Sequence, residues 1–150
     1  MFSQDDTAWM QRAIRLAETA ANNQEVPVGA VLVQDNHIIG EGWNCPISAH
    51  DPSAHAEMIA LRQGAAAIKN YRLVDTTLYV TLEPCMMCVG AIVHARVKRV
   101  IYGASDPKTG AVTSVLQLGE FCFNHRVNYV GGLLAEQCGA LLQHFFRERR

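Results

Sequence analysis

The sequence lacks a disulfide framework, an excess of either charge and a long apolar run, and each absence excludes a class of protein. Only five of the 150 residues are cysteine, and an odd number with one close pair indicates a reducing, cytoplasmic compartment. The formal net charge is −1, so no global basic signal indicates nucleic-acid binding. No apolar run approaches the roughly 18 residues of a membrane span, which argues against a membrane partner.

The hydrophobic pattern predicts one α/β domain over residues 1–150, with a sizeable core because 49% of the chain is hydrophobic. The strands expected near residues 78, 100 and 128 are far enough apart for parallel crossovers, so we expect a mixed sheet covered by helices on both faces. The expected elements are a helix at 7–21 capped by Asp5 or Asp6, strands at 28–33 and 38–43, a helix from Asp51-Pro52-Ser53 to about 67, a strand at 77–81, a helix from Pro84 to about 94, a strand at 99–102, a poorly defined short helix, a strand at 126–130 and a final helix.

Two short motifs carry the chemistry: His55-Ala56-Glu57 and Pro84-Cys85-Met86-Met87-Cys88, each at the start of an expected helix. This pairing is the signature of zinc-dependent deaminases that act on nucleobases. Cys85 and Cys88 are three residues apart, so in a helical first turn both sulfurs lie on one side. A helix N-terminus also favours the thiolates that bind metal. With His55 they make three ligands for one Zn²⁺, which leaves a fourth position for water.

Glu57 is expected to be the catalytic residue. The metal lowers the pKa of its water toward about 7, and a carboxylate beside that water can move its proton to the ring nitrogen and then to the leaving amine. Positions two apart in a regular helix point about 200° away from each other. His55 must therefore lie at the very start of its helix if both side chains are to reach one site.

Several alternatives remain open from the residues alone. A lone Cys-x-x-Cys can be a redox pair, although that does not explain His-Ala-Glu. A structural zinc site needs a fourth ligand, for which Cys45 and His94 are candidates. A non-catalytic, zinc-stabilised RNA-binding module does not need the Glu57 carboxylate. A deaminase of a small molecule, such as guanine, cytosine or a free nucleoside, is the nearest competing function. Cys122 and Cys138 are expected to be ordinary buried thiols.

Further segments point to one branch of these deaminases. They are EVPVGAV (25–31), GEGWN (40–44), HDPSAHAE (50–57), LYVTLEPCMMC (78–88), DPKTG (106–110) and NHRV (124–127). With these segments, residues from about 5 to 150 resemble the bacterial tRNA-specific adenosine deaminases.

The resemblance implies a three-layer α/β/α sandwich with a five-stranded mixed sheet of the cytidine deaminase type, and a homodimer. It implies hydrolysis of adenosine to inosine at the wobble position of a tRNA anticodon loop. It places Asn44 against the purine edge, Val26 against the flipped base and Asp106 beside the target nucleotide, and it adds Ala56 to the substrate contacts. An Asn side chain suits such an edge because it offers both a donor and an acceptor.

Two features depart from the family pattern. Cys45 follows Asn44 where many members are more basic, and the printed sequence ends in Arg147-Glu148-Arg149-Arg150 where many members continue with further charged residues. The arginines are either RNA contacts or a solvated helix end that complements the helix dipole.

Overall fold

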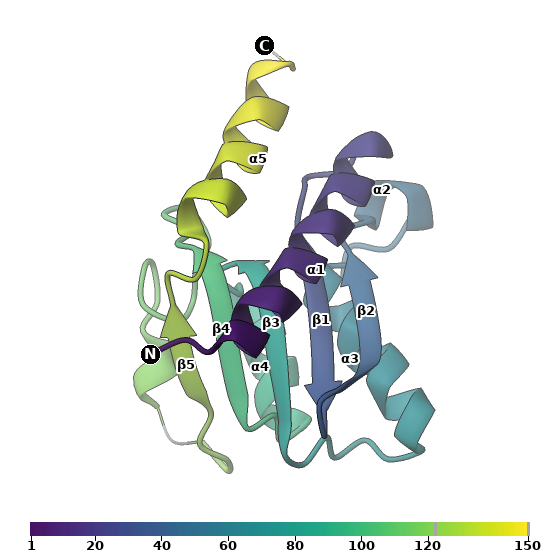
Figure 1. The fold of residues 1–150 in the computed structure, drawn as a ribbon, viewed down its shortest axis with the longest axis vertical. Coiled ribbons are helices and arrows are strands. Elements are labelled where there is room, and N and C mark those ends of the chain that lie inside the picture. Colours follow the sequence, from purple (N-terminus) through teal and green to yellow (C-terminus); the bar gives the residue numbers. More distant parts are fainter. Residues whose placement is uncertain (122, 150) are drawn as a thin grey trace.

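The computed structural model describes residues 1–121 and 123–149, so Cys122 and Arg150 lie outside the described residues. One five-stranded sheet forms the centre (Figure 1). Its order is β2-β1-β3-β4-β5; β1 is antiparallel to β2 and β3, whereas β3, β4 and β5 run parallel. The strands are β1 (Gly29–Gln34), β2 (His37–Trp43), β3 (Thr76–Leu82), β4 (Arg99–Ala104) and β5 (Asn128–Gly131). The mixed sheet expected from the crossover lengths is thus confirmed.

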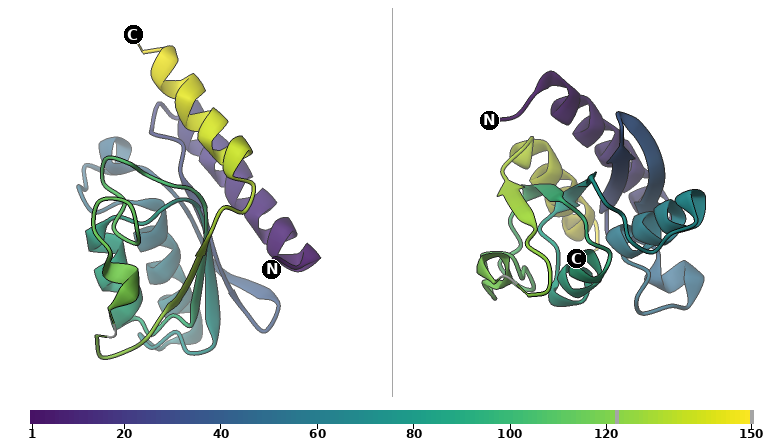
Figure 2. Two further views of the ribbon diagram at one scale, coloured as in Figure 1. Left: turned by 90° about the vertical axis from the view of Figure 1, so that its left-hand side faces the viewer. Right: turned by 90° about the horizontal axis from the view of Figure 1, so that it is seen from below.

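Helices cover both faces of this sheet, as expected for a three-layer sandwich (Figure 2). Helices α1 (Gln4–Asn22) and α5 (Ala135–Arg147) pack on one face, and α3 (Ala56–Ile68) and α4 (Met86–His94) pack on the other. Two short elements complete the fold: α2 (Pro46–Ala49) and a 3₁₀ turn, η1 (Leu118–Glu120). The described part of the chain contains no helix that is both long enough and apolar enough to cross a membrane.

The core is divided in two by the sheet. In β1, Val31 and Val33 face the α1 layer, while Ala30 and Leu32 face the layer of α3 and α4. Because successive side chains of a strand point to opposite faces, a strand buried on both sides has to be apolar throughout. This explains why residues 28–33 form an uninterrupted hydrophobic run.

The start of α1 differs from the expectation at Asp5 or Asp6. Ser3 is the N-cap: its hydroxyl accepts the Asp6 N–H at 3.0 Å, and the Asp6 carboxylate accepts the Ser3 N–H at 3.0 Å. In this capping box Asp6 is the third helical residue. Asp6 also accepts hydrogen bonds from the Tyr79 hydroxyl at 2.6 Å and from Arg99 at 2.9 Å. Burial raises the pKa of Asp6, but these hydrogen bonds outweigh burial and lower it.

Two further helix starts also differ from the expectations. The Asp51 carboxylate holds a turn by accepting the Ser53 N–H at 2.9 Å, so α3 begins only at Ala56, after His55 as N-cap. Cys85 is the N-cap of α4, so Pro84 precedes that helix instead of lying in its first turn. The short α2 was not expected at all.

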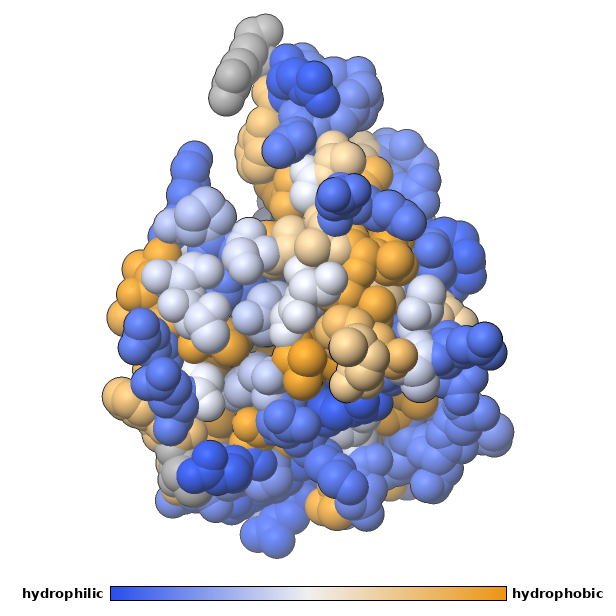
Figure 3. Space-filling model, turned by 60° about the vertical axis from the view of Figure 1, so that its left-hand side comes forward, coloured by the Kyte–Doolittle hydropathy of each residue, from blue (hydrophilic) through white to orange (hydrophobic). Residues whose placement is uncertain are grey.

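The C-terminal part of α5 projects beyond the sheet (Figures 1 and 2). Hydrophilic side chains gather at its free end, and hydrophobic ones lie where the helix joins the rest of the molecule (Figure 3). Arg149 stacks on the Phe145 ring at 3.5 Å and donates to the Gln24 side chain at 2.6 Å. Its guanidinium therefore ties α5 to the end of α1.

Candidate active site

The topology brings four strand ends to one edge of the sheet. Because β3 and β4 are parallel, the residues that follow them, including Cys85 and Asp106, lie on the same edge. Strand β1 runs the opposite way and pairs Gly29 with Trp43, so Val26, which precedes β1, and Asn44, which follows β2, lie there too. Four segments that are distant in sequence therefore meet at this edge of the sheet.

Gly42 allows the first turn of α3 to lie directly on β2. A Cβ atom at this position would come within 2.4 Å of the Ala56 carbonyl oxygen and 2.8 Å of the Ile59 Cβ. Only glycine permits so close an approach between a strand and a helix. The close packing brings His55, which immediately precedes α3, to the shared edge.

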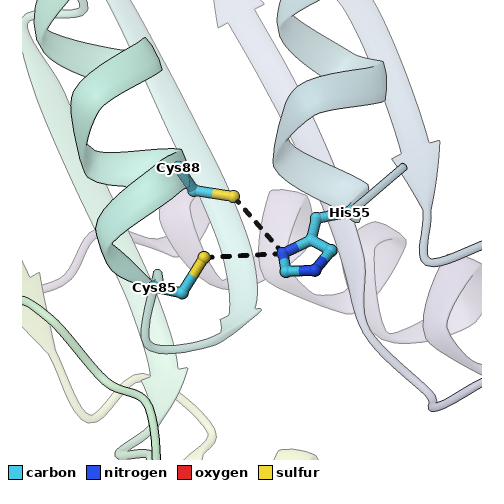
Figure 4. A group of neighbouring side chains, drawn as sticks. All are labelled: His55, Cys85 and Cys88. Carbon is cyan, nitrogen blue, oxygen red and sulfur yellow. Dashed lines mark hydrogen bonds between the residues drawn. The ribbon is translucent and has the colours of Figure 1, made fainter. Parts of the chain in front are cut away.

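Three potential metal ligands meet where α3 and α4 begin (Figure 4). His55 Nδ1 lies 3.5 Å from Cys85 Sγ and 3.7 Å from Cys88 Sγ. A tetrahedral zinc ion with ordinary bond lengths separates nitrogen and sulfur ligands by about 3.6 Å. The positions of these side chains therefore fit a metal ion. Within residues 1–121 and 123–149, no fourth His, Cys, Asp or Glu joins the group, so neither Cys45 nor His94 completes a closed structural site.

The environment of the two sulfurs favours a thiolate at Cys85. A hydrogen bond from Cys88 and another from His55 outweigh burial and lower the pKa of Cys85 to about 4. The same bond to Cys85, together with burial, raises the pKa of Cys88. The hydrogen bond to Cys85 also raises the pKa of His55. The thiolate is the form of cysteine that binds metal.

Glu57 lies in the first turn of α3 and is only 4% exposed. Burial raises its pKa to about 7, so its carboxyl can both take up and release a proton near neutral pH. His55, as the N-cap, has an extended backbone with φ −77° and ψ 155°. The imidazole is therefore not held to the helical spacing, and the expected place of His55 at the very start of the helix is confirmed.

A cavity of about 220 Å³ opens beside these groups. It is smaller than the roughly 300–1,000 Å³ of pockets for drug-sized ligands, which suits one small, flat ring system. Ala56, which the resemblance adds to the substrate contacts, is fully buried in the core and does not line the cavity. The cavity is lined by Val26, Val28, Asn44, His55, Glu57, Leu82, Glu83, Cys85, Asp106 and Thr109.

Two buried carboxylates had no role in the sequence-based expectations. Glu25 accepts the N–H groups of Ile47 at 3.3 Å and Ser48 at 2.7 Å, and so caps α2 beside the cavity. Glu83 accepts the Asp106 N–H at 3.0 Å on the opposite side. Burial raises the pKa of both carboxyls, but hydrogen bonds outweigh it and lower both values. For Glu83 the sequence signal is a single acidic residue within a largely apolar segment, whereas Glu25 follows the polar residues 22–24 and carries no such signal.

Comparisons with known proteins agree with this geometry. Residues 4–150 match the family of MafB19-like deaminases. A tRNA-specific adenosine deaminase of Haemophilus influenzae is 53% identical over 150 residues, which cover 99% of this chain and 87% of the relative. One of Buchnera aphidicola (subspecies Schizaphis graminum) is 44% identical and covers 100% and 99%. The chain belongs to the tRNA-specific adenosine deaminase family.

The solved structures place this family member in the same fold. A structure from a study of A-to-I editing by tRNA:A34 deaminases at the wobble position of tRNA is 40% identical, with a TM-score of 0.87 over 91% of this chain and 99% of that one. A guanine deaminase of Bacillus subtilis is also 40% identical, but with a TM-score of 0.64 over 69% and 66% of the chains. The cytidine deaminase-like sandwich expected from the sequence is therefore confirmed.

We expect Cys85→Ala and Cys88→Ala each to lose tightly bound metal and to lower the thermal midpoint, because the ligands join two separate helices and metal binding is coupled to folding. Metal content by mass spectrometry and unfolding by circular dichroism measure both effects. Cys138→Ala is the matched control, because Cys138 is as buried as Cys88 but packs against Gly103. Unchanged metal content in the Cys85 and Cys88 variants would show that the ligands are elsewhere.

Proposed function

We propose that this protein, as a single deaminase domain spanning residues 1–150, hydrolyses adenosine to inosine at the wobble position of a tRNA anticodon loop. The observation that carries the proposal is the cavity in which the buried Glu57 meets the metal-ligand group and the polar side chains of Asn44 and Asp106. The relatives' names and the tRNA:A34 deaminase structure support this substrate. Extruding a base also costs less from a loop than from a duplex.

We infer that the metal is one Zn²⁺ per chain, held by His55, Cys85 and Cys88. One imidazole and two thiolates are ligands that zinc prefers, and three protein ligands leave a position open. Bound here, zinc would activate a water molecule for attack on the ring carbon that carries the amine. Thiolate ligands persist in a reducing compartment, so we propose that the protein acts in the cytoplasm.

The protein's own groups then move protons and hold the base. The Glu57 carboxylate takes a proton from the attacking water, delivers it to the purine ring nitrogen, and passes the next one to the departing amine. Water and adenosine are thereby converted to inosine and ammonia. A pKa near 7 suits both directions of transfer.

Four residues would position the adenosine. The Asn44 amide can both donate to and accept from the purine edge, and Val26 lines the cavity as an apolar wall for the base. Asp106 lies in the loop at the cavity rim. The side chain of Ala56 is buried in the core, so any contact of this residue with the base falls to its main chain.

Glu57→Gln should retain zinc and the fold but lose turnover by at least about a hundredfold, the usual contribution of general acid–base catalysis. The amide keeps the shape of the side chain and cannot carry the proton. Single-turnover deamination and metal content of the same sample measure the two properties together. A variant that loses stoichiometric zinc and activity in proportion would show that Glu57 acts as a ligand.

An RNA hairpin with adenosine at the wobble position should be a better substrate than free adenosine, free cytidine, guanine or duplex RNA of the same sequence. Hairpin affinity should fall with salt, with a slope of about 0.7 per neutralised phosphate. Arg147→Gln should reduce that slope if the exposed end of α5 contacts phosphate. If a free base or nucleoside is preferred and hairpin binding is weak and flat with salt, the protein is a metabolic deaminase.

We propose that a second copy of the chain docks on the face formed by α3, α4 and the segment around η1, which gives the homodimer expected from the resemblance. Large apolar side chains are exposed there, with Met86 at 67% and Tyr71 at 65%. Apolar cavities of about 260 and 250 Å³ flank α4 and share His94 in their walls. A surface of this kind is typical of an interaction site.

Tyr71→Glu should weaken this dimer about tenfold or more, because burying an unpaired carboxylate costs more than the 1.4 kcal/mol that a tenfold change represents. Sedimentation equilibrium measures the dissociation constant. Phe146→Glu is the matched control, since Phe146 is an exposed aromatic residue near the end of α5, a helix that does not belong to the α3 and α4 face. Equal effects of the two substitutions would place the interface elsewhere, and a monomeric wild type would exclude it.

A further inference from the structure

Glu83 is a buried carboxylate that the proposed chemistry does not use. It directly follows β3 and lies two residues before Cys85. Although only 2% exposed, it lines the same cavity as Glu57. A buried charge is costly unless it is fully hydrogen-bonded, so its partners indicate what it does.

The partners of Glu83 all lie in one loop. Its Oε1 accepts the Asp106 N–H at 3.0 Å and the Ser114 hydroxyl. Its Oε2 accepts the N–H groups of Val112 at 3.0 Å, Thr113 at 2.9 Å and Ser114 at 3.1 Å. Backbone N–H groups that converge in this way stabilise an anion as a cation would. One side chain thus holds both ends of the segment from 106 to 114.

The loop is shaped to enclose this carboxylate. A Cβ atom on Gly110 would come within 2.5 Å of the carboxylate carbon of Glu83 and of the Asp106 carbonyl oxygen. The Gly110 N–H donates to that same carbonyl oxygen at 3.0 Å. The Ala111 N–H donates to the Pro84 carbonyl oxygen at 2.9 Å. The loop therefore packs against the junction that leads from β3 into α4.

The loop presents two residues to the cavity, Asp106 and Thr109. The Asp106 carboxylate accepts the N–H groups of Lys108 at 2.9 Å and Thr109 at 3.2 Å, and the Thr109 hydroxyl at 2.8 Å. This end of the loop is thus a rigid turn, and Glu83 fixes it through the Asp106 N–H. Glu83 is thus two residues from Cys85 in the chain and is hydrogen-bonded to the Asp106 N–H, so it connects the metal-ligand group to the turn that lines the cavity.

We propose that Glu83 is a positioning residue that sets the Asp106–Thr109 turn against the metal centre and so determines how well the RNA substrate binds. The inference rests on the proposed function for its substrate. The role requires a carboxylate because both oxygens accept from N–H groups. A glutamine would direct an NH₂ donor at other donors, and an aspartate is one methylene too short.

The test compares Glu83→Gln with Asp6→Asn as the matched control. Asp6 is also a buried carboxylate, and it accepts from a backbone N–H, a hydroxyl and Arg99, but it lies on the other face of the sheet. For the wobble-adenosine hairpin, Glu83→Gln should raise KM about tenfold or more, because several buried N–H groups lose an acceptor. Metal content should remain unchanged and kcat should change less than KM. Asp6→Asn should lower the thermal midpoint and leave KM unchanged. An equal rise of KM in both variants would overturn the proposal.

A milder pair of variants decides the question if Glu83→Gln does not fold. Ser114→Ala removes the hydroxyl that donates to the Glu83 carboxylate. Thr113→Ala is the control: Thr113 is an exposed residue of the same loop that donates to Glu83 only through its backbone N–H, which the substitution keeps. Ser114→Ala should raise KM about fivefold and Thr113→Ala should not change it. Equal KM values for the two would contradict the positioning role.

Hydrogen exchange separates this inference from the proposed function. The amides of residues 106, 112, 113 and 114 should exchange slowly in the wild type and at least about tenfold faster in Glu83→Gln or Ser114→Ala, with no RNA present. If the wild type does not deaminate the hairpin, the proposed function fails while exchange still measures the anchoring. Unchanged exchange in these variants would overturn the inference even if the hairpin is the substrate.

Discussion

The candidate site depends on one constraint: α3 and α4 must both begin at the same edge of the sheet. His55 and Cys85 each occupy an N-cap, and Cys88 follows one turn later. An N-cap residue has extended backbone, so its side chain is not bound to the helical spacing, while the helix end favours negative charge. These properties allow one imidazole and two sulfurs to converge. Gly42 permits the close helix–strand contact that keeps α3 in place.

Three glutamates are buried around the cavity, and their hydrogen bonds give their carboxyl groups different pKa values. Glu57 is buried without enough compensating donors, and burial raises its pKa to about 7. Glu25 and Glu83 are equally buried, but N–H groups converge on their oxygens and lower their pKa values. The first arrangement suits proton transfer and the second suits a permanent anion that anchors a chain segment. A carboxyl group's donors, and not its burial alone, therefore indicate its role.

The cavity has two walls that are held independently. Glu25 caps α2 next to Asn44, and Glu83 encloses the loop that carries Asp106. Each wall is thus attached to the scaffold by a charge-assisted contact, which is stronger than a neutral hydrogen bond. Apolar residues before β1 and at the end of β3 form further parts of the boundary, and the metal-ligand group lies beside Glu57. A small site with fixed walls suits a rigid ring that enters from a flexible loop.

The sequence by itself predicted that His55, Cys85 and Cys88 form one group, that Glu57 lies beside it, and the order of all the main strands and helices except the short α2. It could do so because spacing within a helix and apolar periodicity are local properties. Only the tertiary structure decided how Val26, Asn44 and Asp106 meet, since that depends on strand pairing between distant segments. It also assigned Glu25 and Glu83 to partners more than 20 residues away. It moved the start of α3 from Asp51-Pro52-Ser53 to Ala56, because Asp51 uses its carboxylate to hold a turn. A capping signal and a turn signal share the same residue types, and only the completed contacts distinguish them.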